Sequence, residues 1–376
     1  MVVTLHHIPR SPPRSVISCV VGIAAKTCII DQAGQARLRY NDFLMGTGLI
    51  WWVLLAALVA AIWFAALRLR EPNGLHFYYQ LFRAQRQANR FYADCPGLTK
   101  NVDYHPDMPG RLDVYRPDSG SGHPVVIYVY GGSWRTGNKE LYAPAAQRLL
   151  PSGFVLVIPE YTLYPAAGYP RQTQEIAAAM AWTLDHIAQY GGDPGRVVLV
   201  AQSAGAQIAG LALLEPRWLA AYGHSATDLR GFIGISGVYD FAAVLAYHGN
   251  NGRAREMMAE ILGGAGNAGR ASPITYVSPQ APPMLLIHGD ADTTVPLAVG
   301  LDFYRKLQAA GVRSEFITYA GAGHADILFR ALTEQPPRLL NDIVGFVERC
   351  TLPDTTNAVE RIPRVESGPT VADQGP

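Results

Sequence analysis

The chain has 376 residues and a formal net charge of +1 at pH 7. This balance gives no electrostatic reason to expect nucleic acid as a partner. About half of the residues (49%) are hydrophobic, so the length and composition fit one large α/β domain with appendages. The four cysteines have no C-x-x-C spacing and share no motif with histidine, so we expect no metal site.

The N-terminal part predicts a membrane anchor. Residues 43–67 carry no charge and would form a helix of ~37 Å, enough to cross a hydrocarbon core of ~30 Å. Tryptophans toward both ends are typical of interfacial aromatic belts. A buried core helix and a cleaved signal peptide are the alternatives. We expect a single-pass transmembrane helix with the lipid bilayer as a partner.

The segments on either side of this span are less informative. Residues 1–42 have no clear periodicity, and we expect them to be disordered or not translated, with Met45 as the true start. Basic residues are nearly balanced across the span, and a start at Met45 would favour a cytoplasmic catalytic domain. Residues 68–99 form a juxtamembrane segment. Its stretch 75–92 is expected to be a helix, either along the membrane surface or an ordinary surface helix.

From about Lys100 onward, strand patterns alternate with helix patterns. This alternation predicts an α/β fold over residues 100–350, with a mainly parallel sheet flanked by helices. A turn is expected at Asp193-Pro194. The polar residues 351–376 predict a disordered tail. Strands are expected at 124–130, 154–159, 196–200, 231–235, 283–287 and 314–319, and helices at 140–150, 172–190, 204–214, 298–310 and 337–348.

Ser203 lies where a predicted buried strand breaks into small residues before a helix. This is the pattern of a nucleophile elbow, a sharp turn that exposes a serine hydroxyl above a sheet. A serine hydroxyl needs a histidine base, and the histidine needs a carboxylate that fixes its tautomer. On this fold the acid and then the histidine follow the serine along the chain. Asp292 and His324 each come just after a predicted strand in that order.

Other titratable residues near these loops are assigned supporting roles. Asp290 is the rival acid. Asp326 is expected to cap or begin a helix after the histidine loop. His288 is expected to brace the acid loop rather than to react.

The oxyanion formed during attack on a carbonyl must be met by preorganised N–H donors. We expect these donors to be the backbone amides of Gly132, Ser133 and Ala204. Ala204 follows the nucleophile, and the other two follow an early predicted strand, where glycines let the backbone approach a substrate. A plain β-turn at residues 131–134 is the alternative.

Four motifs carry a resemblance to the α/β-hydrolase superfamily. They are YGGSW at 130–134, GGDPGRVVLVAQSAGAQIAGLALLE at 191–215, HGDADTTVP at 288–296 and GHADILF at 323–329. The chain is similar to the esterase branch with an HGG-x-W oxyanion motif, and especially to isoprenylcysteine methylesterase-like, BD-FAE-type carboxylesterases. The resemblance implies hydrolysis of carboxylic esters through Ser203, His324 and Asp292, without a cofactor, and membrane association.

Two residues depart from the pattern of that group. Ala201 replaces the first glycine of the elbow and must fit one more methyl group between strand and helix. Tyr130 replaces the histidine of the oxyanion loop, whose donors are backbone amides. Residues 237–280 are expected to form a cap inserted between two core strands. We expect Trp134 and Tyr239 to line the substrate pocket, although the apolar side chains of the cap could equally be its own packing.

Location beside a membrane favours lipophilic or prenylated esters as substrates. An arylformamidase-type amidase is the alternative activity, because such enzymes resemble this chain in the oxyanion loop. An alternative of another class is a hydrolase-like interaction module that has lost catalysis.

Overall fold

The computed structural model describes residues 16–21, 24–30, 36–40, 75–249, 252–328 and 338–351. The chain divides into two compact units, Met1–Phe82 and Arg83–Pro376. In the first unit, β1 (Val16–Val21), β2 (Ala24–Ile30) and β3 (Ala36–Tyr40) form an antiparallel sheet in that order. Residues 1–42 were expected to be disordered or not translated, and strands form in these three ranges. Val, Ile and Thr, which favour strands, are frequent in β1 and β2.

The predicted membrane span 43–67, the start at Met45 and the tail 352–376 lie outside the described residues. Within the described residues, the structure contains no helix that is both long and apolar enough to span a membrane.

The second unit is built on an eight-stranded sheet with the order β11-β10-β9-β8-β6-β7-β5-β4. Strands β6 to β11 pair in parallel, and β4 and β5 add an antiparallel edge next to β7. The prediction of a mainly parallel sheet is confirmed. The strands are β4 (Leu98–Asp103), β5 (Arg111–Tyr115), β6 (His123–Val129), β7 (Val155–Pro159), β8 (Gly192–Gln202), β9 (Gly231–Ile235), β10 (Met284–Gly289) and β11 (Ser314–Tyr319).

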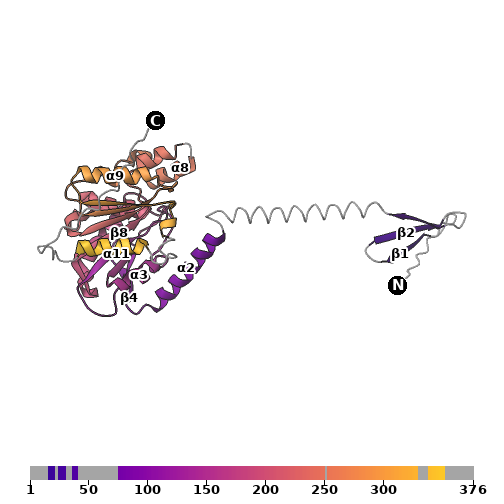
Figure 1. Ribbon diagram of the computed structural model, residues 1–376, viewed down its shortest axis with the longest axis horizontal. Helices are drawn as coiled ribbons and strands as arrows, with labels where there is room; N and C mark the ends of the chain where they lie inside the picture. Colours follow the sequence, from indigo (N-terminus) through magenta and orange to yellow (C-terminus); the bar gives the residue numbers. More distant parts are fainter. Residues whose placement is uncertain are drawn as a thin grey trace, which may run out of the picture. The chain divides into compact units, whose positions relative to one another are not determined.

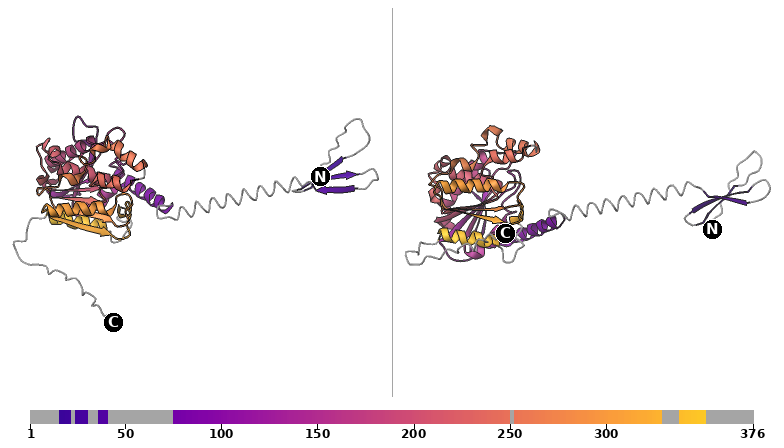
Figure 2. Two further views of the ribbon diagram at one scale, coloured as in Figure 1. Left: turned by 90° about the horizontal axis from the view of Figure 1, so that it is seen from above. Right: turned by 45° about the horizontal axis from the view of Figure 1, so that its top comes forward.

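Helices cover both faces of this sheet. Figures 1 and 2 show α9 on one face and α11 on the other, while α4 packs beside α5 and α11 lies near α3. The helices are α2 (Leu75–Asp94), α3 (Ala143–Leu149), α4 (Arg171–His186), α5 (Ala204–Leu214), α6 (Pro216–Ala220), α7 (Phe241–Tyr247), α8 (Gly252–Ile261), α9 (Leu297–Ala309) and α11 (Arg338–Thr351). Short 3₁₀ turns are η1 (Leu150–Ser152), η2 (Ile187–Tyr190), η3 (Ala226–Asp228), η4 (Ala265–Asn267) and η5 (Pro273–Tyr276).

The core lies on both sides of the central strands. Every residue of β7, β9 and β10 is buried, because parallel strands covered on both faces need continuous apolar sequence. All residues of α5 are buried as well, so this helix is the central one on its face. Its N-terminus follows β8 directly, which fixes the position of residue 203 in the middle of the sheet.

Two boundaries differ from the sequence predictions. Asp193-Pro194 belongs to the first residues of β8 instead of a separate turn. The Asp193 carboxylate accepts the Gly195 amide at 2.8 Å, and the pairing with β6 shifts register there, so the strand begins with a bend. The last turn of the predicted helix 172–190 is the 3₁₀ segment η2, which Gly191 ends at φ 80°.

The segment predicted as a cap connects β9 to β10. It contains α7 and α8, followed by η4 and η5. Helix α7 begins where the Asp240 carboxylate accepts the amides of Ala242 and Ala243. Polar contacts tie the cap to neighbouring loops: His248 Nε2 lies 2.9 Å from the Thr294 carbonyl oxygen, and Glu260 pairs with Arg135.

Candidate active site

Ser203 occupies the turn between β8 and α5. Its backbone has φ 52° and ψ −121°, a strained conformation for a residue with a side chain. The Ser203 amide donates to the Ile235 carbonyl oxygen of β9 at 2.8 Å, so the sheet holds the turn in place. This geometry presents the hydroxyl at the carboxyl edge of the sheet, as a nucleophile elbow does.

Small residues let α5 approach the sheet behind Ser203. A methyl group on Gly205 would lie 2.3 Å from the Tyr130 carbonyl oxygen and 2.4 Å from that of Val129. Ala201, which stands in place of a glycine, is fully buried and lies beside Gly234 in register. The chain therefore accommodates a methyl group at position 201, but has no space for one at 205.

We expect Gly205→Ala to lower the free energy of unfolding by about 2 kcal/mol or more, because backbone atoms must move to admit the methyl group. Gly210→Ala is the matched control on the same helix. Its added methyl group would meet Pro273 at 3.4 Å, an ordinary contact, and alanine favours helix by up to about 1 kcal/mol. Urea unfolding of both variants measures the difference; equal stabilities would contradict the packing.

The structure brings Ser203, His324 and Asp292 together. Ser203 Oγ lies 2.8 Å from His324 Nε2, and His324 Nδ1 lies 2.7 Å from Asp292 Oδ2. Asp292 is in the loop after β10, and His324 is in the loop after β11. When Nδ1–H donates to the carboxylate, Nε2 is left as the acceptor for the serine hydroxyl.

Asp292 sits in a site built for a carboxylate. Its Oδ1 accepts the amides of Thr294 and Val295, each at 2.9 Å. His288 Nε2 lies 3.3 Å from Oδ2 and 2.9 Å from the Val295 carbonyl oxygen. Burial raises the pKa of Asp292, but the hydrogen bonds from His288 and His324 outweigh burial and hold the pKa well below its ordinary value. The carboxylate is thus charged throughout the neutral range.

This lowered pKa predicts a pH dependence of stability. A group whose pKa is depressed on folding stabilises the fold above its unfolded pKa, ~3.9 for Asp, and this contribution is lost as the pH falls through the folded value. We therefore expect the unfolding free energy of the wild type to exceed that of Asp292→Asn most clearly above pH ~5. The gap should close on acidification. Chemical unfolding at several pH values measures it, and a gap that widens below pH ~4 would contradict the assignment.

The other two carboxylates brace the loop that carries His324. Asp290 Oδ1 accepts the Gly321 amide at 2.6 Å, and Asp326 Oδ2 accepts the Gly323 amide at 2.7 Å. His324 is therefore paired with Asp292, whereas Asp290 contacts the backbone of the loop that carries His324.

The loop after β6 begins with a tight turn. Gly132, Ser133 and Trp134 follow one another at φ 127°, 53° and 61°. The Gly132 carbonyl oxygen accepts the amides of Arg135 and Thr136 at 3.1 and 3.0 Å, which closes the turn. Within residues 83–249 and the other described ranges, the Gly132 and Ser133 amides have no acceptor in the chain. The Ala204 amide, at the start of α5, has no acceptor within the helix.

The two predicted pocket residues lie in different surroundings. Trp134 is buried, donates from Nε1 to Gln207 Oε1 at 2.8 Å, and stacks on Phe241 of the cap at 5.2 Å between ring centroids. It therefore joins the loop after β6 to the cap. Tyr239 is 1% exposed and stacks on Phe303 of α9 at 4.3 Å. The expectation that Tyr239 lines the pocket is corrected, because its ring packs in the core beneath the cap.

Tyr130, which replaces a histidine, supports the loop from below. Its ring stacks on Tyr142 at 5.1 Å and on Tyr161 at 4.9 Å, and Tyr161 Oη donates to its carbonyl oxygen at 3.0 Å. Gly137 packs directly on the ring, since a methyl group there would lie 2.8 Å from it. Aromatic packing thus holds this part of the loop.

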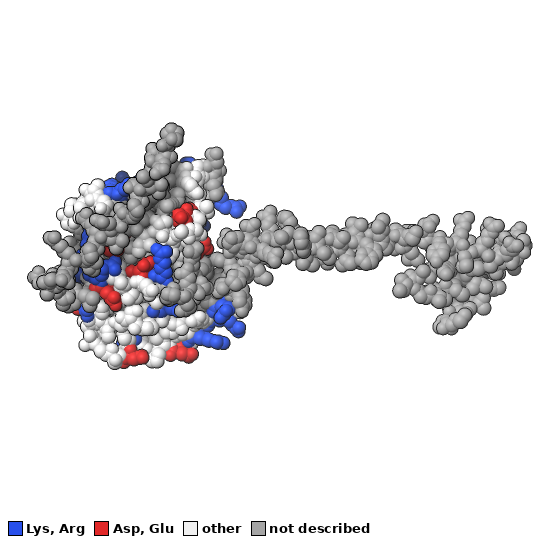
Figure 3. Space-filling view, in the orientation of Figure 1, with Lys and Arg blue, Asp and Glu red and all other residues white. Residues whose placement is uncertain are grey.

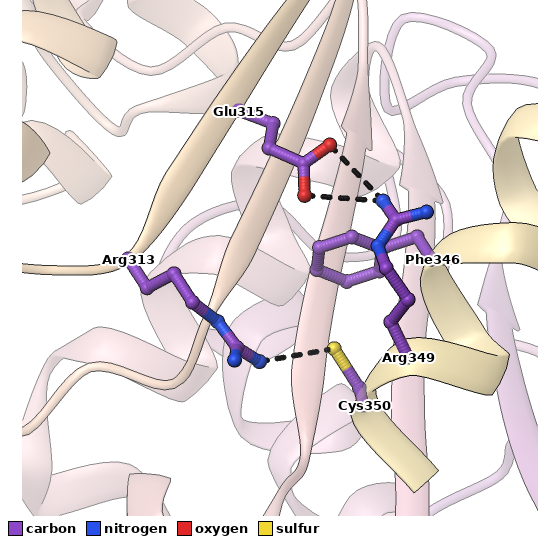
Figure 4. A pocket seen from close by; sticks show the side chains of 5 residues that line it. All are labelled: Arg313, Glu315, Phe346, Arg349 and Cys350. Carbon is purple, nitrogen blue, oxygen red and sulfur yellow. Dashed lines mark hydrogen bonds and ion pairs between the residues drawn. The ribbon is translucent and has the colours of Figure 1, made fainter. Parts of the chain in front are cut away.

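A pocket also lies at the edge of the sheet, away from these residues (Figure 4). It is lined by Arg313 just before β11, by Glu315 of β11 and by Phe346, Arg349 and Cys350 of α11. Arg349 pairs with Glu315 at 3.0 Å, and burial raises the pKa of the Cys350 thiol. On the described part of the face drawn in Figure 3, basic and acidic side chains are interspersed.

A mainly parallel sheet that presents a serine elbow after β8, an aspartate after β10 and a histidine after β11 defines an α/β hydrolase. The chain belongs to the BD-FAE family, whose model matches residues 112–307.

Relatives with known names agree with this assignment. The chain is 27% identical over 338 residues to isoprenylcysteine alpha-carbonyl methylesterase of Arabidopsis thaliana, covering 86% of this chain and 74% of the relative. It is 31% identical over 273 residues to esterase LipQ of Mycobacterium tuberculosis, covering 66% and 62%. An esterase structure from Pyrobaculum calidifontis shares the fold with a TM-score of 0.61 at 21% identity, covering 71% and 91%. The chain is a carboxylic ester hydrolase of the α/β-hydrolase type.

Proposed function

We propose that the chain cleaves carboxylic esters through a Ser203–His324–Asp292 triad and an acyl-enzyme intermediate. The observation that carries this proposal is the continuous chain of hydrogen bonds, 2.8 Å from Ser203 Oγ to His324 Nε2 and 2.7 Å from His324 Nδ1 to Asp292 Oδ2. The Gly132, Ser133 and Ala204 amides, which have no hydrogen-bond acceptor among the described residues, are the donors available to an oxyanion.

The reaction has two similar halves. Ser203 Oγ attacks the ester carbonyl carbon while its proton moves to His324 Nε2, and Asp292 stabilises the imidazolium. The amides of Gly132, Ser133 and Ala204 hold the oxyanion. The alkoxide leaves with the proton from His324. Water then attacks the acyl-enzyme by the same route and restores Ser203. Every proton transfer uses groups of the chain, so the mechanism requires no metal or organic cofactor.

Active-site labelling tests this mechanism. A fluorophosphonate should phosphonylate the full-length protein once, and peptide mass spectrometry should place the adduct on Ser203. An adduct on another residue would contradict the assigned nucleophile. A wild type that neither reacts nor hydrolyses esters would support the alternative of a hydrolase-like interaction module.

We propose lipophilic or prenylated esters as the substrates. The Arabidopsis relative is named an isoprenylcysteine methylesterase, and the uncharged stretch 43–67 would keep the enzyme near lipids. The methyl ester of an S-prenylated cysteine should be hydrolysed with a higher kcat/KM than its S-methyl counterpart. Equal values would contradict a prenyl preference.

We further propose that residues 43–67 anchor the enzyme in a membrane as a single span, with the catalytic domain on the cytoplasmic side. This proposal rests on the sequence. The full chain should resist alkaline carbonate extraction, and deletion of 43–67 should release it. In sealed vesicles that enclose the cytoplasmic side of the membrane, added protease should leave the catalytic domain intact.

An arylformamidase-type amidase is the second candidate, because both reactions use a serine nucleophile and an oxyanion loop. Parallel assays of a small ester and an N-formyl aromatic amine separate the two activities. We expect the ester to be the better substrate, and a higher kcat/KM for the formamide would reverse the assignment.

A further inference from the structure

A group of charged side chains around the buried Lys139 joins the oxyanion loop to the sheet. Lys139 lies in the second half of this loop, between β6 and α3, and is 2% exposed. Its Nζ is 2.6 Å from Glu140 Oε1, 3.8 Å from Asp113 Oδ1 and 3.7 Å from Glu160 Oε2. Asp113 belongs to β5, and Glu160 follows β7, so two of the three partners are carried by the sheet.

The charges in this cluster do not balance, because one ammonium group faces three carboxylates. Burial alone would lower the pKa of Lys139, but its acidic neighbours outweigh burial and raise that pKa. Burial raises the pKa values of Asp113 and Glu160. Asp113 Oδ1 accepts the Asn101 amide at 2.8 Å, and Oδ2 is buried without a hydrogen-bond partner among the described residues. Lys139 is therefore the cation that makes the buried Asp113 carboxylate tolerable.

The position of Lys139 in the loop links this cluster to the oxyanion donors. Gly132 and Ser133 open the loop at the end of β6, and Lys139 closes it before α3. Between them, the contacts of Gly132 with Thr136 and of Gly137 with the Tyr130 ring leave little space for adjustment. We therefore expect a shift of the backbone at Lys139 to move the Gly132 and Ser133 amides.

We propose that Lys139 is a positioning residue for the oxyanion hole. Its buried ammonium group, held by Asp113 and Glu160, fixes the loop so that the Gly132 and Ser133 amides point to the place where the oxyanion forms. This inference rests on the proposed ester hydrolysis. We assign the holding of the Lys139 ammonium group to Asp113 and Glu160 on the sheet, although its nearest partner is Glu140 within the loop.

The test compares variants of the full-length protein. Lys139→Met keeps the length of the side chain and removes its charge. We expect kcat for a small ester to fall about 10- to 100-fold while KM changes less than about 3-fold, since one lost oxyanion donor costs ~10²- to 10³-fold. A trifluoromethyl ketone, which forms an oxyanion adduct with a serine, should lose affinity in the same proportion. The affinity for the matching methyl ketone should stay unchanged.

Further variants separate positioning from folding. Asp113→Asn with Glu160→Gln removes both sheet partners at constant shape, and it should reproduce the Lys139→Met effect. Glu140→Gln should change kcat less than about 3-fold, and Lys306→Met is the matched control at an exposed lysine. All rates are expressed per fluorophosphonate-reactive site, which removes any effect of unfolded protein.

Two results would overturn the inference. One is a folded Lys139→Met with wild-type kcat and wild-type affinity for the trifluoromethyl ketone. If Lys139→Met does not fold, the second such result is a wild-type kcat and a wild-type affinity for the trifluoromethyl ketone in the Asp113→Asn, Glu160→Gln double variant. In both cases the wild type still hydrolyses esters, whereas a failure of the proposed function would appear as an inactive and unlabelled wild type.

Discussion

Ser203→Ala is expected to lower kcat for ester hydrolysis by ~10⁶-fold, because removing the nucleophile of a triad disables the other two members as well. KM should change little, since the methyl group of alanine leaves the oxyanion amides and the pocket in place. A residual rate ~10³-fold above that in water should remain, from the oxyanion hole and binding. Steady-state kinetics with a chromogenic ester measure both values.

Ser236→Ala provides the control for this prediction. Ser236 follows β9 next to Ile235, is fully buried, and its Oγ has no hydrogen-bond partner among the described residues. It is therefore a nearby serine whose hydroxyl has no part in the proposed mechanism, and its loss should leave kcat within a few fold. If Ser203→Ala retained more than ~1% of the wild-type kcat, Ser203 would not be the nucleophile.

Asp292→Asn is expected to lower kcat by ~10⁴-fold. The asparagine can keep Oδ1 on the Thr294 and Val295 amides, so the loop should hold its shape. Its second group is then an NH₂ donor facing His324 Nδ1. The histidine must accept there and carry its proton on Nε2, which is the wrong tautomer for taking a proton from Ser203.

Asp290→Asn is the matched variant for this effect. Asp290 lies two residues away and contacts the Gly321 amide instead of the imidazole. Its replacement should cost less than ~10-fold in kcat, since the asparagine oxygen can still accept that amide. A larger loss for Asp290→Asn than for Asp292→Asn would make Asp290 the acid.

The strand pattern made much of the site predictable. Ser203, Asp292 and His324 each follow a run of apolar residues, and the carboxyl ends of neighbouring parallel strands meet at one edge of a sheet. Asp290 and Asp292 lie in the same turn after β10, and the path of the backbone in that turn decides which carboxylate reaches His324. The sequence favoured Asp292, and the hydrogen bond to His324 distinguishes the two.

Other parts lacked a sequence signal. Strands β4 and β5 were missed, because β4 is half-exposed and polar while two of the five residues of β5, Arg111 and Asp113, are charged. Tyr239 has the composition of a pocket residue, and only the path of the chain after β9 turns its ring onto Phe303. Lys139 was not assigned a role, since a single lysine in a loop usually points to solvent. Its charge is paired there with Asp113 of β5 and with Glu160, which follows β7.

The cap leaves and rejoins the sheet through two adjacent strands. Ile235 ends β9 at the carboxyl edge of the sheet, whereas Met284 begins β10 opposite Phe232, because the two strands pair in parallel. The cap is therefore part of a crossover connection, and the entropic cost of closing such a connection grows only slowly with its length. We therefore expect residues 237–280 to be exchangeable as one cassette, while the strands that precede Ser203, Asp292 and His324 keep their register.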